Sequence, residues 1–171
     1  MKGRVACEIN TCDEILASEI IFNNILEPLN PPETAAILSA LVCQEKSKDM
    51  QTLTTRMEIA KGDIESIHLQ LEDLQLQLGI RVDSESKPSV NFTLAAVVYE
   101  WARGVSFNKI ASMTEVPEGS IVRCITRLDE LCKDIRNAAR VIGNPSLYRK
   151  LEAASECIKR DIVFAASMYI A

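Results

Sequence analysis

The sequence predicts an all-α fold, a multi-helix bundle of about seven helices with one long central helix. Aromatic residues make up only 5% of the chain, whereas leucine, isoleucine, alanine and glutamate abound, and this balance favours helices over sheets. Apolar residues recur three and four positions apart along several stretches, and helix-capping or helix-breaking residues separate these stretches. The length allows one domain with a substantial core, so we expect residues 1–171 to form a single bundle.

Two helices are predicted in the first quarter of the chain. One opens at a cap on Thr11, with acidic residues in its first turn, and stops before Pro28. The next opens at Asn30, followed by two prolines whose missing N–H groups do no harm in a first helical turn. Residues 1–10 carry no cap and resemble a segment that arrives from something upstream.

A long helix is predicted from about Met50 to Leu78, with Gly79 as the residue that ends it. Its predicted buried stripe consists of apolar residues three or four positions apart: Leu53, Met57, Ala60, Ile64, Ile67, Leu71, Leu74 and Leu78. His68 lies in this helix with no second ligand candidate, so we expect neither a metal nor a catalytic role there. Residues 80–90 are predicted to form an internal loop.

Shorter helices follow the loop. Asn91 or Thr93 is predicted to start a helix that ends at Gly104, and Ser106 a short one after it. A turn over residues 114–117 then leads into the longest predicted helix. Short helix, turn and long helix also outline a helix-turn-helix DNA-binding domain, which is one alternative. The first turns of the long helix are mostly apolar, however, and this composition disfavours reading of a DNA groove.

The long helix, Glu118 to Ile142, has two different faces. Its apolar residues recur with helical spacing and predict a core face: Ile121, Cys124, Ile125, Leu128, Leu131, Cys132, Ile135, Ala139 and Ile142. The opposite face carries five polar residues that are again three or four positions apart. We call them the polar ridge: Arg123, Arg127, Glu130, Asp134 and Asn137. Taken alone, this ridge is either a solvated surface with weak ion pairs, each worth about 0.2–0.5 kcal/mol, or a binding surface.

The C-terminal part is predicted to start a new helix after a compact stop at residues 143–145. The stretch from Ser146 to the end forms one helix or a broken pair. It carries no charge after Asp161, so this tail must be buried against the domain or against a neighbour. Arg160 is expected to anchor the tail.

Several function classes lack the residues they need. Six cysteines without a CxxC pair and a single histidine predict neither a zinc site nor a disulfide framework, so we expect thiols of a reducing compartment. No stretch approaches the roughly 18 apolar residues of a membrane span, and the start lacks a signal-peptide core. No phosphate-binding loop or catalytic motif occurs, so we expect a soluble, intracellular, monomeric and non-enzymatic chain without catalytic or metal-binding residues.

Charge divides the chain unequally, although its net value is −5. Residues 1–98 hold 8 basic and 15 acidic side chains, whereas residues 99–171 hold 11 basic and 9 acidic ones. An anionic partner would therefore bind the second half.

Seven blocks of sequence carry a resemblance to a known family: KGRVACEI, LVCQE, VVYEWARG, FNKIASMT, PEGSIVRCITRLDEL, AARVIGN and IKRDIVFAASMY. They resemble, in the same order, the C-terminal DSHCT domain of exosome-associated DExH-box RNA helicases. The resemblance runs from about Lys2 to Tyr169. The blocks around Pro117 and Arg160 look closer to the cytoplasmic superkiller (SKI complex) helicase than to its nuclear relative.

The resemblance implies a bundle attached to two upstream RecA-like ATPase modules, which would bind ATP and Mg²⁺, while this chain itself holds no cofactor. In this family one long helix, often called the ratchet helix, crosses the RNA channel. Glu118 to Ile142 matches that helix, and the resemblance places Arg127 and Glu130 on its base-contacting positions, with Arg123 as a possible phosphate partner. The implied function is to line the channel of a 3′-to-5′ helicase that feeds RNA to the exosome.

The partners implied are single-stranded RNA, the RecA-like core, and subunits of the SKI complex and the exosome, in the cytoplasm or, alternatively, the nucleus. The rival function is a non-catalytic protein-interaction or scaffolding bundle. In that case the polar ridge faces solvent, and the acidic first half meets partner subunits.

Overall fold

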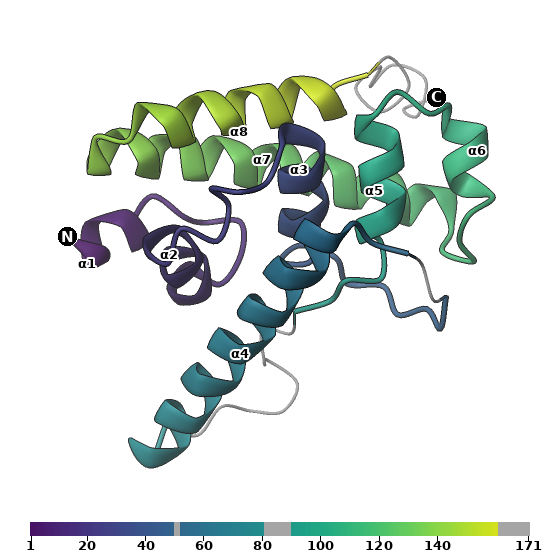
Figure 1. The fold of residues 1–171 in the computed structure, drawn as a ribbon. Coiled ribbons are helices and arrows are strands. Elements are labelled where there is room, and N and C mark those ends of the chain that lie inside the picture. Colours follow the sequence, from purple (N-terminus) through teal and green to yellow (C-terminus); the bar gives the residue numbers. More distant parts are fainter. Residues whose placement is uncertain (50–51, 81–89, 161–171) are drawn as a thin grey trace.

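The computed structural model describes residues 1–49, 52–80 and 90–160, and all regular secondary structure within them is helical (Figure 1). The helices, in order, are α1 Lys2–Ala6, α2 Glu14–Phe22, α3 Pro31–Ser39, α4 Thr55–Gln77, α5 Ala95–Ala102, α6 Phe107–Ala111, α7 Glu118–Ile142 and α8 Pro145–Ile158. This confirms the predicted all-α class. Among the described residues, no helix is both long and apolar enough to cross a membrane.

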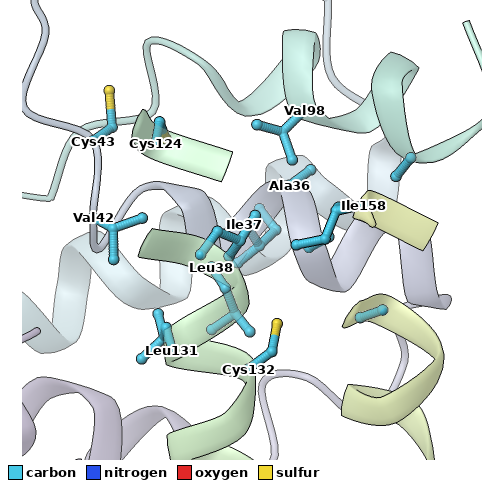
Figure 2. Close-up of a cluster of buried hydrophobic side chains, with 14 of the residues drawn as sticks. Ala36, Ile37, Leu38, Val42, Cys43, Val98, Cys124, Leu131, Cys132 and Ile158 are labelled. Carbon is cyan, nitrogen blue, oxygen red and sulfur yellow. The ribbon is translucent and has the colours of Figure 1, made fainter. Parts of the chain in front are cut away.

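The short helix α3 lies at the centre of the bundle, in contact with α4, α5, α7 and α8. Its residues 35–38 are fully buried. Figure 2 shows Ile37 and Leu38 of α3 among side chains from α5, α7 and α8. In Figure 1, α7 and α8 run side by side across the bundle, whereas α4 extends away from it. The longest helix, α7, therefore packs on a core whose centre is α3.

A capping box fixes the start of α3 where the sequence predicts it. The Asn30 side chain accepts a hydrogen bond from the Glu33 N–H group at 2.9 Å, and the Glu33 carboxylate accepts one from the Asn30 N–H group at 3.1 Å. Glu33 is only 2% exposed and also binds Arg56 at 3.2 Å and Thr54 at 3.1 Å, which ties the start of α4 to α3. The sequence did not reveal this second role of Glu33.

Three predicted helix starts are wrong by a few residues. Asp13, not Thr11, caps α2, because its carboxylate accepts hydrogen bonds from the N–H groups of Ile15 and Leu16. The Thr11 hydroxyl instead donates to Asp134. Helix α4 begins after a cap on Thr54 rather than near residue 50. Neither Asn91 nor Thr93 caps α5, which begins at residue 95 without a side-chain cap. Helix α1, which the sequence did not predict, forms within residues 1–10.

The predicted helix ends are confirmed at three glycines. Gly79, Gly104 and Gly143 have φ angles of 69°, 100° and 74°, a left-handed conformation that favours glycine and ends a helix. After Gly143, the Asn144 side chain accepts a hydrogen bond from the Leu147 N–H group at 3.0 Å, so the predicted stop and restart are also confirmed.

The predicted buried stripe of α4 is only half correct. Met57, Ala60 and Ile64 are buried against the bundle, but Leu74 and Leu78 are 52% and 67% exposed. The reason is geometric, since α4 projects beyond the other helices and its distal half meets too few of them (Figure 1).

Arg160 fastens the end of α8 to the end of α5. Its guanidinium stacks 4.0 Å from the Trp101 ring and donates hydrogen bonds to the carbonyl groups of Trp101 and Val105 at 2.9 and 2.7 Å. Trp101 in turn donates its indole N–H to the Ile158 carbonyl at 2.9 Å. The expected anchor therefore acts on α5. The uncharged tail and most of the predicted 80–90 loop lie outside the described residues.

Candidate nucleic-acid interface

Helix α7 begins at Glu118 and ends at Ile142, as the sequence predicts. Its apolar face packs against α1, α3 and α8, which confirms the predicted core face except at Ile142, which is only half-buried. Its buried apolar residues are Ile121, Cys124, Ile125, Leu128, Leu131, Cys132, Ile135, Ala138 and Ala139. Because these neighbours hold α7 along most of its length, the opposite face presents its side chains from a rigid support.

The first turns of α7 are unsuited to entering a DNA groove. Ile121 and Ile125 are fully buried and Cys124 is only 5% exposed, so the recognition positions of a helix-turn-helix would lie in the protein core. The structure therefore argues against the DNA-binding alternative.

Arg123 occupies the first turns of the polar ridge and is exposed. One of its guanidinium nitrogens lies 3.5 Å from the Ser120 hydroxyl, at the limit of a hydrogen bond, and that hydroxyl donates to Glu45 at 2.7 Å. Arg123 and Arg127 also line a pocket of about 40 Å³ against residues 42–45. This volume is far below the roughly 300–1,000 Å³ of a typical ligand pocket, so a nucleobase would have to lie on the outer surface of the two arginines.

Arg127 is half-buried and Glu130 is exposed, one turn farther along α7. Within the part of the chain that the structure describes, neither side chain has a hydrogen bond or an ion pair, not even with the other. An unpaired arginine fixed at its base by packing is a ready donor for an external ligand. The ordinary Arg127–Glu130 surface pair allowed by their spacing does not form.

Asp134 belongs to the predicted polar ridge, but its carboxylate is used in hydrogen bonds within the protein. Its carboxylate accepts hydrogen bonds from the N–H groups of Asn10 and Thr11 at 2.9 and 3.1 Å, and from the Thr11 hydroxyl at 2.7 Å. It thereby joins the segment between α1 and α2 to α7. Four residues of the polar ridge stay available to a ligand, and we call them the available ridge: Arg123, Arg127, Glu130 and Asn137.

Asp129 is a polar residue that sequence reasoning missed. It is only 2% exposed, accepts a hydrogen bond from the Ser155 hydroxyl of α8, and pairs with Lys133 at 3.1 Å and Lys159 at 3.6 Å. The Asp129–Lys133 spacing was the one visible signal, since residues four apart meet on a helix. This cluster joins α7 to α8.

Two neighbouring thiols, Cys43 and Cys124, lie beside Arg127 in the same small pocket. A hydrogen bond from Cys124 is the main reason why the pKa of Cys43 falls to about 7. The same hydrogen bond and burial raise the pKa of Cys124 well above its ordinary value, with Arg127 opposing the shift. The described residues contain no cluster of three potential metal ligands, and we assign no metal-binding or catalytic residue.

Comparison with known proteins identifies the family. A family model of the DSHCT (NUC185) domain matches residues 1–165, nearly the whole chain. The chain belongs to this family. Similar proteins include the DExH-box ATP-dependent RNA helicase DExH11 of Arabidopsis thaliana, at 46% identity over 172 residues. They also include Superkiller complex protein 2 of Homo sapiens, at 41% over 170 residues, and Exosome RNA helicase MTR4 of Homo sapiens, at 40% over 171 residues.

This DSHCT domain chain accounts for a small part of those helicases. Each alignment covers 99% of the chain but only 13%, 14% and 16% of the three relatives, in the same order. The chain is therefore related to a helicase-associated module.

Proposed function

We propose that this DSHCT domain lines the RNA channel of an ATP-dependent 3′-to-5′ RNA helicase that feeds RNA to the exosome. In this proposal Arg127 and Glu130 touch bases of the moving strand, and Arg123 meets a phosphate. The observation that carries the proposal is the pair Arg127 and Glu130, which have no hydrogen bond or ion pair in the described structure and stand on the outer face of a firmly packed helix.

The chemistry of these side chains fits a sliding strand. A guanidinium can stack on any base or hold a phosphate, because neither contact depends on base identity. A carboxylate one turn away can accept a hydrogen bond from a base edge or orient the guanidinium. Few, weakly selective contacts let RNA pass without being retained.

The proposal assigns energy conversion to another part of the protein. ATP and Mg²⁺ would bind in upstream RecA-like modules, and this domain would supply no cofactor site. Its partners would be single-stranded RNA, that helicase core and, through the whole protein, SKI complex and exosome subunits. We place the protein in the cytoplasm on the blocks that look like the superkiller helicase, with the nucleus as the alternative.

A second candidate function, a protein-interaction bundle, is favoured by the exposed leucines on the distal half of α4. In that candidate the available ridge carries no RNA. Binding to RNA is therefore the property that separates the two functions.

The test is binding of a fluorescent single-stranded RNA to the isolated chain, followed by anisotropy. Replacing Arg127 with alanine is expected to weaken binding about fivefold to a hundredfold, since a base or phosphate contact is worth roughly 1–3 kcal/mol. Arg149→Ala is the matched control, because it removes the same charge from an exposed position on α8. Equal losses in both variants would mean that only net charge matters and would refute the assignment of Arg127.

A further inference from the structure

Cys43 and Cys124 lie beside each other although they are far apart in the sequence. Cys43 comes from the segment that follows α3, and Cys124 lies near the start of α7 (Figure 2). Both line the same small pocket, and the Cys124 thiol donates a hydrogen bond to Cys43. Two thiols that share a hydrogen bond need only a small movement of their side chains to bring the sulfur atoms to bonding distance.

Further hydrogen bonds fix the segment that carries Cys43 against the start of α7. The Glu45 carboxylate accepts a hydrogen bond from the Ser120 hydroxyl at 2.7 Å. The Asp49 carboxylate accepts one from the Thr114 hydroxyl at 2.9 Å, in the turn before α7. Residues 43–49 therefore run along the start of α7 in the opposite direction, and the two thiols are held opposite each other in the folded chain.

The pocket that the two thiols line admits only a small molecule. Cys43 and Cys124 are 6% and 5% exposed, so neither is open to a bulky reagent. The pocket has a volume of about 40 Å³. This exceeds the roughly 10–15 Å³ that one water molecule needs and is far below the roughly 300–1,000 Å³ of a typical ligand pocket. Hydrogen peroxide, with two oxygen atoms, fits such a space.

The charges around the pocket favour a thiolate at Cys43. Arg123 and Arg127 line the pocket from α7, and Glu45 is the one carboxylate among its lining residues. Reactive cysteines lie in electropositive surroundings of this kind. A hydrogen bond from Cys124 lowers the pKa of Cys43 to about 7, against the opposing effect of burial. About half of this thiol is therefore ionised at neutral pH.

We propose that Cys43 and Cys124 form a reversible disulfide when hydrogen peroxide enters this pocket, with Cys43 as the attacking thiol. The Cys43 thiolate attacks one peroxide oxygen and the O–O bond breaks. Cys43 becomes a sulfenic acid, and the other oxygen leaves as water with the proton that Cys43 gave up. Cys124 then attacks the Cys43 sulfur, the S–O bond breaks, and the Cys124 proton leaves with that oxygen as a second water. The two thiols are oxidised by two electrons, which reduce peroxide to water.

The environment of Cys124 suits the second step. Its hydrogen bond with Cys43 and its burial raise its pKa well above the ordinary value, so it is not the first thiol to react. Conversion of Cys43 to a sulfenic acid removes the negative charge that opposes ionisation of Cys124. Glutathione or another thiol reduces the disulfide again by exchange. None of these steps requires RNA, so the proposal stands apart from RNA binding.

Peptide mapping after brief treatment of the folded chain with hydrogen peroxide tests the pairing. Free thiols are blocked during denaturation, and digestion after lysine, arginine and glutamate places each of the six cysteines on its own peptide. Mass spectrometry is expected to find Cys43 joined to Cys124, and dithiothreitol should separate them. The exposed thiol of Cys7 is the internal control. Linkage of other cysteines in place of this pair, or no linkage, would overturn the proposal.

Two variants separate the attacking thiol from its partner. Cys124→Ser keeps a hydrogen-bond donor beside Cys43 and should leave a sulfenic acid there, which dimedone traps. Cys43→Ser should give no dimedone adduct on Cys124. Cys7→Ser, the matched control, should form the disulfide at the rate of the unchanged chain. Equal adducts on Cys43 and Cys124 in the first two variants would overturn the assigned roles. Melting curves check folding, and the mapping of the unchanged chain needs no variant.

The pH profile of disulfide formation gives a second readout in the unchanged chain. The rate should be half-maximal near pH 7, where the Cys43 thiolate forms, and should level off at higher pH. The other charged groups that line the pocket, Glu45, Arg123 and Arg127, do not change charge in this range. A rate that kept rising to about pH 9, as for an ordinary thiol, would contradict Cys43 as the attacking group.

Discussion

Helices α4 and α7 have nearly the same length, 23 and 25 residues, and both carry an apolar stripe with helical spacing. Their environments differ. Helix α7 is covered by α1, α3 and α8 along most of its stripe. Helix α4 contacts α2 and α3, and its stripe changes from buried at Met57 and Ile64 to exposed at Leu74 and Leu78. The comparison shows that periodicity identifies the face of a helix that prefers burial. Whether that face is buried depends on how many other helices reach it.

The largest expected effect comes from the stripe of α7. Leu128→Ala should lower the free energy of unfolding by about 2–5 kcal/mol, because the side chain is fully buried and its loss leaves a cavity. Leu74→Ala on α4 should change it by less than about 0.5 kcal/mol, because that leucine is 52% exposed. Urea unfolding of the two variants measures the contrast. Equal losses would mean that the distal half of α4 is packed in solution.

The next effect compares two adjacent carboxylates on α7. Asp129→Ala should cost about 1–3 kcal/mol, because it leaves the Ser155 hydroxyl buried without its acceptor. Glu130→Ala should cost no more than about 0.5 kcal/mol, because Glu130 is exposed and has no partner among the described residues. Thermal and urea unfolding test the difference. If both substitutions were equally harmless, Asp129 would not join α7 to α8 as the structure indicates.

A smaller effect follows from the neighbouring thiols Cys43 and Cys124, the second of which lies near the start of α7. The lowered pKa of Cys43, about 7, predicts one thiolate that appears in ultraviolet absorbance near neutral pH, while Cys132, with a pKa of about 12, stays silent there. Because the folded pKa lies below the ordinary value of 9.0, this group stabilises the fold fully above pH 9. That contribution is lost as the pH falls through about 7.

The contribution of Cys43 to the free energy of unfolding should therefore rise between pH 7 and pH 9, whereas the raised pKa values of Cys124 and Cys132 act in the opposite direction. The difference between the chain and its Cys43→Ala variant at each pH isolates the contribution of Cys43. Cys124→Ala removes the hydrogen bond to Cys43 and should move the thiolate step toward higher pH. A step that stays near neutral pH in this variant would contradict the proposed cause.

Local patterns made much of the fold predictable. The bounds of α7, the cap at Asn30 and the stop at Gly143 depend on residues within a few positions of each other, so the sequence contains the whole interaction. Asp134 was misplaced because its partners, Asn10 and Thr11, lie more than 120 positions away in the chain. The buried role of Asp129 depends on Ser155 in the same way.

The candidate site was predictable only in part. Spacing located the polar ridge, and the structure shows that one of its members, Asp134, is already hydrogen-bonded to Asn10 and Thr11. Spacing could not say whether Arg127 and Glu130 bind anything, because a solvated face has the same pattern. Their assignment to RNA came from the family resemblance, and it stays a prediction.

The most direct test joins this domain to the RecA-like modules of its natural protein and replaces both Arg127 and Glu130 with alanine. Stability should change by no more than about 0.5 kcal/mol and basal ATPase activity should persist, because neither side chain has a partner in the described structure. The measurement is RNA unwound per ATP hydrolysed. It should fall clearly in the double variant, and unchanged unwinding by a folded double variant would show that the available ridge is only surface.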